Sequence, residues 1–175
     1  NASQPTPYRM TYVHQHETDY FYDERLMSGE PVHIRVTRDS KTKELKPGGV
    51  VAKQRIADLN VYSPRRPFDF RISISTETPT ALPPETSTPV YSREKDRLSY
   101  AHQIFQVDLT QVTLPTKPQE PLHELEIEFR KASELIHYAF MSRGNHAEAP
   151  QDWTAFEDLT YVFLNNIRLL IRNNI

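Results

Sequence analysis

Two short stretches of this sequence carry charges of one sign at every second residue. Three cations alternate with other residues in YSREKDRLSY, and three carboxylates alternate with other residues in LHELEIEF. The residues concerned are Arg93, Lys95, Arg97, Glu124, Glu126 and Glu128. On a strand, side chains two apart share a face and stand close enough for like charges to repel. Each stripe therefore needs compensation, and we expect the two stripes to face each other.

A basic wall beside a row of carboxylates suits the chemistry of phosphate and a hard divalent cation. Guanidinium forks match phosphate oxygens in pairs, and Mg²⁺ or Mn²⁺ takes carboxylate oxygens. A closed sheet with an apolar outside would gather both stripes in one lumen. Either stripe alone is typical of a solvated strand face. The two together, with Arg35 in register on a third strand, favour a charged interior.

Most of the chain before residue 130 alternates apolar and polar residues with a period of two. The clearest examples are VHIRVT, DFRISIS, FQVDLTQV and LHELEIEF. This period predicts strands with one apolar and one polar face. Proline and glycine clusters between them, such as SPRRP (63–67) and KPGG (46–49), predict turns.

The last third of the chain changes to helical spacing. A first helix is expected to end near Gly144, and its apolar stripe consists of Ala132, Leu135, Ile136, Ala139 and Phe140. A second helix is expected from Asp152, and its apolar stripe consists of Phe156, Leu159, Phe163, Ile167 and Leu170. We therefore expect a single α+β domain over residues 1–175, with strands to about 129 and helices over 130–175. Its expected architecture is an antiparallel sheet or barrel with flanking helices.

Composition narrows the chemistry further. The 175 residues carry a net charge of −2, so an anionic ligand must meet a local basic cluster. There is no cysteine, which excludes disulfides and thiolate metal sites. No apolar run approaches the roughly 20 residues of a membrane span, so we expect no membrane partner. His14 and His16 are two apart, but no third metal ligand is evident beside them, and we interpret them as ordinary surface residues.

Several motifs together resemble a known family. In chain order they are HETDYFYD, VHIRVTRDSKT, VAKQRI, VYSPRRPFDFRIS, REKDRLSY, VDLTQV and HELEIEF. The sequence is similar to the fungal RNA 5′-triphosphatases of mRNA capping, within the triphosphate tunnel metalloenzyme family. The similarity runs from about Thr11 to the C-terminus. It implies a closed, eight-stranded antiparallel barrel that removes the γ-phosphate from the 5′-triphosphate end of nascent pre-mRNA, with Mg²⁺ or Mn²⁺ as cofactor.

The resemblance also implies roles for individual residues. Those matching phosphate-binding positions are Arg35, Lys53, Arg93, Lys95 and Arg97, with Lys95 and Arg97 expected to contact the γ-phosphate directly. Glu128 and Glu124 match the metal-binding motif. The other carboxylates of the site are Glu77 and Glu126, which could orient the attacking water, and Asp108, in the shell around the metal. Asp19 matches an aspartate that supports the barrel wall.

One element of the family pattern is missing. The family's other metal-binding motif is a Glu-x-Glu pair on an early strand, and this sequence has no such strand before Thr11. The Glu-x-Glu spacing occurs only at 124–128. We expect this sequence to be a fragment, with little activity until that strand is restored.

The resemblance implies partners as well. These are 5′-triphosphate RNA, the mRNA guanylyltransferase, a phosphorylated tail of RNA polymerase II or of an elongation factor, and a second copy of the chain, all in the nucleus. Two alternatives stay open: a phosphate- or phosphopeptide-binding barrel without catalysis, and a hydrolase of tripolyphosphate with the same fold. The carboxylate stripe argues against a pure phosphate binder, which has no use for carboxylates facing its ligand.

Overall fold

The structure is a computed structural model, and it describes residues 9–25, 29–66, 68–144 and 150–173. Seven strands come before two helices in this part of the chain. The strands are β1 (Thr11–Arg25), β2 (Pro31–Asp39), β3 (Leu45–Val61), β4 (Phe70–Pro79), β5 (Tyr91–His102), β6 (Phe105–Leu114) and β7 (Lys117–Phe129). The helices are α1 (Ala132–Gly144) and α2 (Pro150–Asn173).

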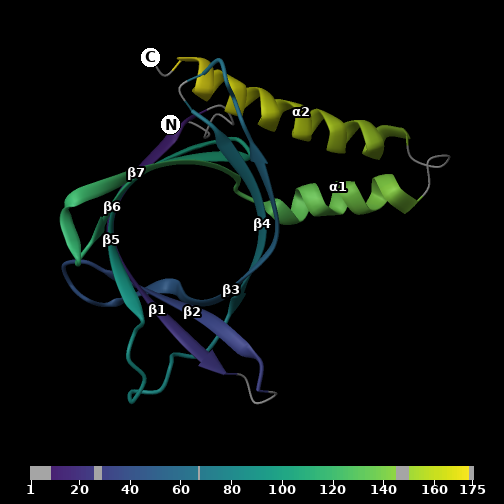
Figure 1. Cartoon of the computed structure of the whole chain (residues 1–175). Coiled ribbons are helices and arrows are strands. Elements are labelled where there is room, and N and C mark those ends of the chain that lie inside the picture. Colours follow the sequence, from purple (N-terminus) through teal and green to yellow (C-terminus); the bar gives the residue numbers. More distant parts are fainter. Residues whose placement is uncertain (1–8, 26–28, 67, 145–149, 174–175) are drawn as a thin grey trace, which may run out of the picture.

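All seven strands form one antiparallel sheet in the order β4-β3-β2-β1-β5-β6-β7. Figure 1 shows that this sheet curls into a ring, with both helices outside it. The expected α+β class, a largely antiparallel sheet with flanking helices, is confirmed. The expected eight-stranded closure is not seen, because the described residues supply seven strands and leave β4 and β7 as edges.

The aromatic contacts of α2 show which side chains point out of the ring. Phe163 on α2 stacks on Phe129 at 4.8 Å and on Phe105 at 6.1 Å between ring centroids. Because α2 lies outside the ring, Phe105 and Phe129 point outward. Their chain neighbours Gln106 and Glu128 then point inward, since successive side chains on a strand alternate between faces. The cross-strand register extends this inner face from β7 and β6 to β5 and β1.

The KPGG segment (46–49) lies within β3 and is not the turn that the sequence predicts. The register between β2 and β3 shifts between Val36 and Arg38, opposite this segment. Gly48 has a φ of +66°, and a Cβ on Gly49 would stand 2.7 Å from the carbonyl oxygen of Thr37. Glycine satisfies both requirements, so the pair forms an irregularity that bends the strand without ending it.

The two helices differ in how their apolar stripes are covered. On α2 the expected stripe is sheltered, and Ile167 is buried. On α1 the stripe is open among the described residues, with Ile136 66% and Phe140 77% exposed. The apolar stripe of α1 is therefore not covered by the sheet as the stripe of α2 is. Helix α2 begins at Pro150, ahead of the expected start at Asp152.

No helix in the described ranges combines the length and apolar character needed to cross a membrane.

Buried side chains lie on both faces of the sheet, and they include charged as well as apolar residues. The buried apolar residues include Ile34, Val36, Val51, Phe105 and Val112. Asp19, Lys95 and Asp108 are just as inaccessible, at 0%, 6% and 2% exposure. Charged groups are almost never buried unless they are paired, so these three indicate the site.

Candidate active site

Asp19 on β1 neutralises the middle of the basic stripe. Its carboxylate is fully buried and lies 3.0 Å from Lys95 Nζ and 3.1 Å from Arg93 Nε, both on the adjacent β5. The Thr37 hydroxyl on β2 donates to it at 2.7 Å. Lys95 makes a second ion pair with Glu17 at 3.1 Å. Strand pairing places these groups together, because Asp19 lies opposite Thr37 on one side and Arg93 on the other.

The cations around Asp19 decide its charge state. Burial by itself raises the pKa of a carboxyl, but Lys95, the Thr37 hydroxyl and Arg93 outweigh that effect and hold the pKa of Asp19 below its ordinary value. Asp19 is therefore an anion at neutral pH, and it is the compensating charge that Lys95 and Arg93 need.

Arg97, at the other end of the basic stripe on β5, is the centre of a second group of polar contacts. Its guanidinium lies 3.2 Å from Asp108 on β6 and 3.3 Å from Glu126 on β7, and its Nε donates to the Thr110 hydroxyl at 3.0 Å. Asp108 is almost inaccessible, whereas the Glu126 side chain is 54% exposed. One cation thus joins the basic strand to the carboxylate strand across β6.

A third cluster comes from β2, β3 and β4. Glu77 on β4 accepts from Arg35 at 2.9 Å and from Lys53 at 3.2 Å. Burial raises the pKa of Glu77, but Arg35 and Lys53 more than compensate and the net shift is downward. Arg35 Nε is buried and has no hydrogen-bond partner among the described residues. A buried donor without a partner is costly, so this nitrogen is a candidate contact for a bound anion.

Glu128 on β7 has the opposite electrostatic environment. Its pKa is raised, first by burial and then by the neighbouring carboxylates of Asp108 and Glu126, with a smaller contribution from Glu77. The Gln106 amide donates to Glu128 at 3.2 Å and to Asp108 at 3.1 Å, and so links the two acids. Glu128 is therefore less readily ionised than Asp19 or Glu77, whose pKa values are lowered.

The two charged stripes compensate each other, but not across a hollow. Strands β5 and β7 flank β6, so both stripes lie on one wall. Arg97 meets Glu126 directly, and Arg93 reaches Glu124 at 4.0 Å. The expected opposition was wrong because two strands separated by one neighbour share a face, and long side chains bridge the strand between them.

Comparison with known proteins agrees with this geometry. The family model described as "mRNA capping enzyme, beta chain" matches residues 1–175. This chain belongs to that family. The mRNA-capping enzyme subunit beta of Schizosaccharomyces pombe is 32% identical over 176 residues, covering 99% of this chain and 55% of the relative. The corresponding subunit of Cryptococcus neoformans is 36% identical over 162 residues, covering 89% of this chain and 36% of the relative.

Solved structures show the same fold. The structure of S. pombe Pct1 RNA triphosphatase in complex with the Spt5 CTD superposes with a TM-score of 0.80 at 32% identity. The match covers 99% of this chain and 63% of that one. This member of the capping beta-chain family thus spans about half the length of its S. pombe relative.

Sequence reasoning missed four polar residues that hold the site together. They are Glu17, Thr37, Gln106 and Thr110. Glu17 shares its strand face with Asp19, so alternation along β1 could have identified it. The other three are neutral, and only the register between strands reveals their contacts.

Fewer carboxylates converge on one point than a complete metal cage needs. Asp108 and Glu128 share the Gln106 amide, whereas the nearest cation to Glu124 is Arg93. In the described ranges, no three carboxylates of the inner face bring ligand atoms within 4.8 Å of one another. Hard cations take six or more oxygen ligands, so these residues supply part of a coordination shell.

The pKa shifts predict acid sensitivity of this family member. Asp19 and Glu77 have lowered pKa values in the fold, so their stabilising contribution is present above the ordinary carboxyl pKa of about 4 and is lost below it. Glu128 has a raised pKa, so its charge opposes folding and protonation removes that cost. We expect the free energy of unfolding to fall steeply below about pH 4. Urea unfolding between pH 3 and 7 measures this, and a Glu77→Gln chain should show a shallower acid decline.

Proposed function

We propose that this protein hydrolyses the γ-phosphate from the 5′-triphosphate end of nascent pre-mRNA, the first step of cap formation. The observation that carries the proposal is the inner wall, on which each arginine is held in place by carboxylates. Phosphoryl transfer depends on positioning and on electrostatic stabilisation more than on covalent chemistry by the protein. A wall of fixed cations beside carboxylates supplies both.

Five cations of the inner face would bind the triphosphate. Arg35 and Arg97 present guanidinium forks with side chains 22% and 20% exposed, and the unpaired Arg35 Nε leaves a donor for a phosphate oxygen. Lys53 is the most open, at 48% exposure. Arg93 sits over the Phe21 ring at 5.4 Å and is held by Asp19. Lys95, 5% exposed, pairs with both Glu17 and Asp19, and it would contact the phosphate only by exchanging one of these partners.

Glu128 and Glu124 would hold a divalent metal ion, with Asp108 in the surrounding shell. The residues fit this cofactor, because the nearby carboxylates of Asp108 and Glu126 raise the pKa of Glu128, and a divalent cation bound to Glu128 would offset their repulsion. The all-oxygen donor set suits Mg²⁺ or Mn²⁺. Such an ion, when bound, neutralises charge that develops on the phosphate oxygens.

Glu77 and Glu126 are the carboxylates placed to orient the attacking water. Each is already fixed by a cation, Glu77 by Arg35 and Lys53 and Glu126 by Arg97, and each keeps a solvent-accessible side chain. A carboxylate with a lowered pKa, as in Glu77, stays ionised and accepts a hydrogen bond from water at neutral pH. The buried carboxylate of Asp108 holds the Arg97 guanidinium in position through an ion pair.

We further propose that an eighth strand closes the ring between β4 and β7. These two strands are the edges of the curled sheet among the described residues. A strand pairing there would satisfy both rows of free backbone groups and remove the edges. With a Glu-x-Glu pair on its inner face, it would also add the carboxylates that the metal site lacks.

The proposed partners follow from the same role. The product, a 5′-diphosphate RNA end, is the substrate of the mRNA guanylyltransferase, so we place the protein with that enzyme in the nucleus. Pct1 has been solved in complex with the Spt5 CTD. We extend a tail-docking role to this protein, with a phosphorylated tail of RNA polymerase II or of an elongation factor as partner. The open stripe of α1, with Phe140 77% exposed, is available to a second copy of the chain.

The test is metal-dependent release of phosphate from 5′-triphosphate RNA by the complete gene product, in Mg²⁺ and in Mn²⁺. We expect release that stops with chelator and falls in a Glu128→Gln protein. Binding of the RNA without release would contradict the enzyme and favour a phosphate-binding barrel. Faster cleavage of tripolyphosphate than of RNA would contradict the RNA substrate.

A further inference from the structure

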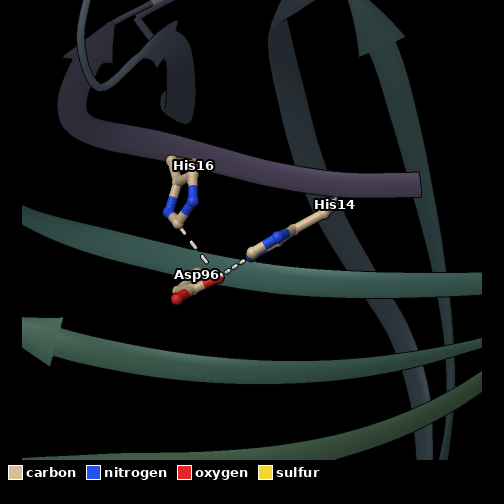
Figure 2. A group of neighbouring side chains, drawn as sticks. All are labelled: His14, His16 and Asp96. Atoms are coloured by element: carbon tan, nitrogen blue, oxygen red, sulfur yellow. Dashed lines mark hydrogen bonds and ion pairs between the residues drawn. The ribbon is translucent and has the colours of Figure 1, made fainter.

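We propose that His14, His16 and Asp96 form a second metal site, for Zn²⁺, on the outer wall of the sheet. The two histidines lie on β1 and the aspartate lies on β5, directly opposite His16 in the strand register. Figure 2 shows both imidazole rings reaching toward one carboxylate. Alternation along the strands places this cluster on the face opposite Glu17 and Lys95, so it is separate from the proposed active site.

The distances suit a zinc ion after a small adjustment. His16 Nδ1 lies 3.6 Å from Asp96 Oδ1, and His14 Nε2 lies 2.5 Å from the same oxygen in a hydrogen bond. All three ligand atoms fall within 4.8 Å of one another, the only such trio among the described residues. Tetrahedral zinc with bonds of about 2.1 Å places its ligands about 3.4 Å apart. A three-ligand set therefore requires the His14–Asp96 hydrogen bond to open by about 1 Å, with the two imidazole nitrogens, which lie within 4.8 Å, at the same spacing.

The surroundings leave room for a fourth ligand from solvent. The side chains of all three residues are 43% to 46% exposed. An open cavity of about 270 Å³ is lined by His16 and Asp96 together with Ser40, Glu94, Lys95, Gln111 and Thr113. Two imidazoles, one carboxylate and a water form a donor set that suits zinc, whereas Mg²⁺ prefers oxygen ligands alone.

A metal bound here would link β1 to β5 directly behind an ion pair of the inner face. Residues 16 and 96 are the immediate neighbours of Glu17 and Lys95, which form an ion pair on the other side of the same two strands. Zinc binding would therefore restrain the backbone that carries the Lys95 cluster. This inference stands on the outer cluster alone and does not depend on the proposed hydrolysis.

The experiment titrates Zn²⁺ into the untagged chain by calorimetry, in excess Mg²⁺. We expect one zinc equivalent, with the affinity lowered about tenfold or more by His14→Ala, His16→Ala or Asp96→Asn. Because the chain has no cysteine, visible absorption of bound Co²⁺ reports histidine and carboxylate ligands and should disappear in the same variants. Zinc binding that persists in a Glu128→Gln chain does not depend on the proposed inner metal ligand Glu128.

His33 supplies the matched control. Its Nδ1 lies 2.6 Å from Asp23 Oδ1, the same kind of exposed pair without a second histidine. His33→Ala should leave the zinc affinity unchanged. The proposal is overturned if the parent chain takes up no zinc, if His16→Ala retains parental affinity, or if His33→Ala weakens binding equally. Circular dichroism of each metal-free variant checks its fold, and Asp96→Asn, which preserves side-chain size, decides the matter if a histidine variant unfolds.

Discussion

Replacing Arg97 with alanine is expected to lower kcat for γ-phosphate release by about 10²–10³-fold in the complete gene product. Arg97 is the cation that meets both the buried Asp108 and the exposed Glu126, so it stands where basic and acidic strands join. Its fork is fixed before substrate arrives, and a fixed donor needs no reorganisation as charge develops on the phosphate. Steady-state kinetics with 5′-triphosphate RNA measure the loss.

Two further variants separate catalysis from folding. Arg97→Lys keeps a positive charge beside Asp108 but loses the fork, so it should fold like the parent and still lose most of kcat. Arg38→Ala removes a half-buried arginine whose guanidinium donates to the Lys43 carbonyl, away from the inner-face ion pairs, and should leave the rate unchanged. Near-parental rates in Arg97→Ala would refute the phosphate clamp. A rise in KM with kcat unchanged would show that Arg97 stabilises the bound substrate and the transition state equally.

Alternation along the sequence was enough to identify the inner face. The period of two places Arg93, Lys95 and Arg97 on one side of β5, and cross-strand pairing aligns that side with Asp19 and Asp108. This prediction works because side chains alternate between the two faces of a strand. Shifting the strand register by one residue would move every charged side chain to the outer face and every apolar side chain to the inner face, so the pattern specifies the register. Strand identity and side-chain face are therefore local properties that the chain encodes strongly.

Pairing between particular charges could not be predicted in this way. The basic stripe has several acidic neighbours, and only the register shows that Lys95 lies between Glu17 and Asp19 while Arg97 takes Asp108. In this structure Lys95 is therefore buried between two carboxylates, a pairing that the sequence pattern did not indicate. Similarly, KPGG has the composition of a turn, and only the close approach of Gly49 to Thr37 shows that it continues a strand.

The outer histidines illustrate the same limit. His14 and His16 carry a recognisable spacing, but the third ligand comes from residue 96, on a strand that pairs with β1 across some 80 positions of sequence. No local pattern marks Asp96 as their partner, because REKDRLSY reads as a basic stripe. A metal site assembled from two strands becomes visible only when the pairing order of the sheet is known.

Asp19→Asn is expected to destabilise the chain by about 3–5 kcal/mol, the typical cost of removing one partner of a buried ion pair. The asparagine fits the space and can still accept from the Thr37 hydroxyl, but it leaves Lys95 and Arg93 with less compensating charge in a buried position. Glu17 would remain as the one carboxylate near Lys95. Urea unfolding at neutral pH, followed by circular dichroism, measures the change.

Lys95→Met, combined with Asp19→Asn, tests whether charge is the cause. If the loss comes from an uncompensated ammonium, removing that ammonium should recover part of the stability, and the two substitutions should be strongly non-additive. Asp23→Asn is the matched control, because its carboxylate is 62% exposed and pairs with an exposed histidine, where ion pairs contribute little. A cost below about 1 kcal/mol for Asp19→Asn, or simple additivity with Lys95→Met, would mean that the inner wall is held by packing and backbone pairing and not by its buried charges.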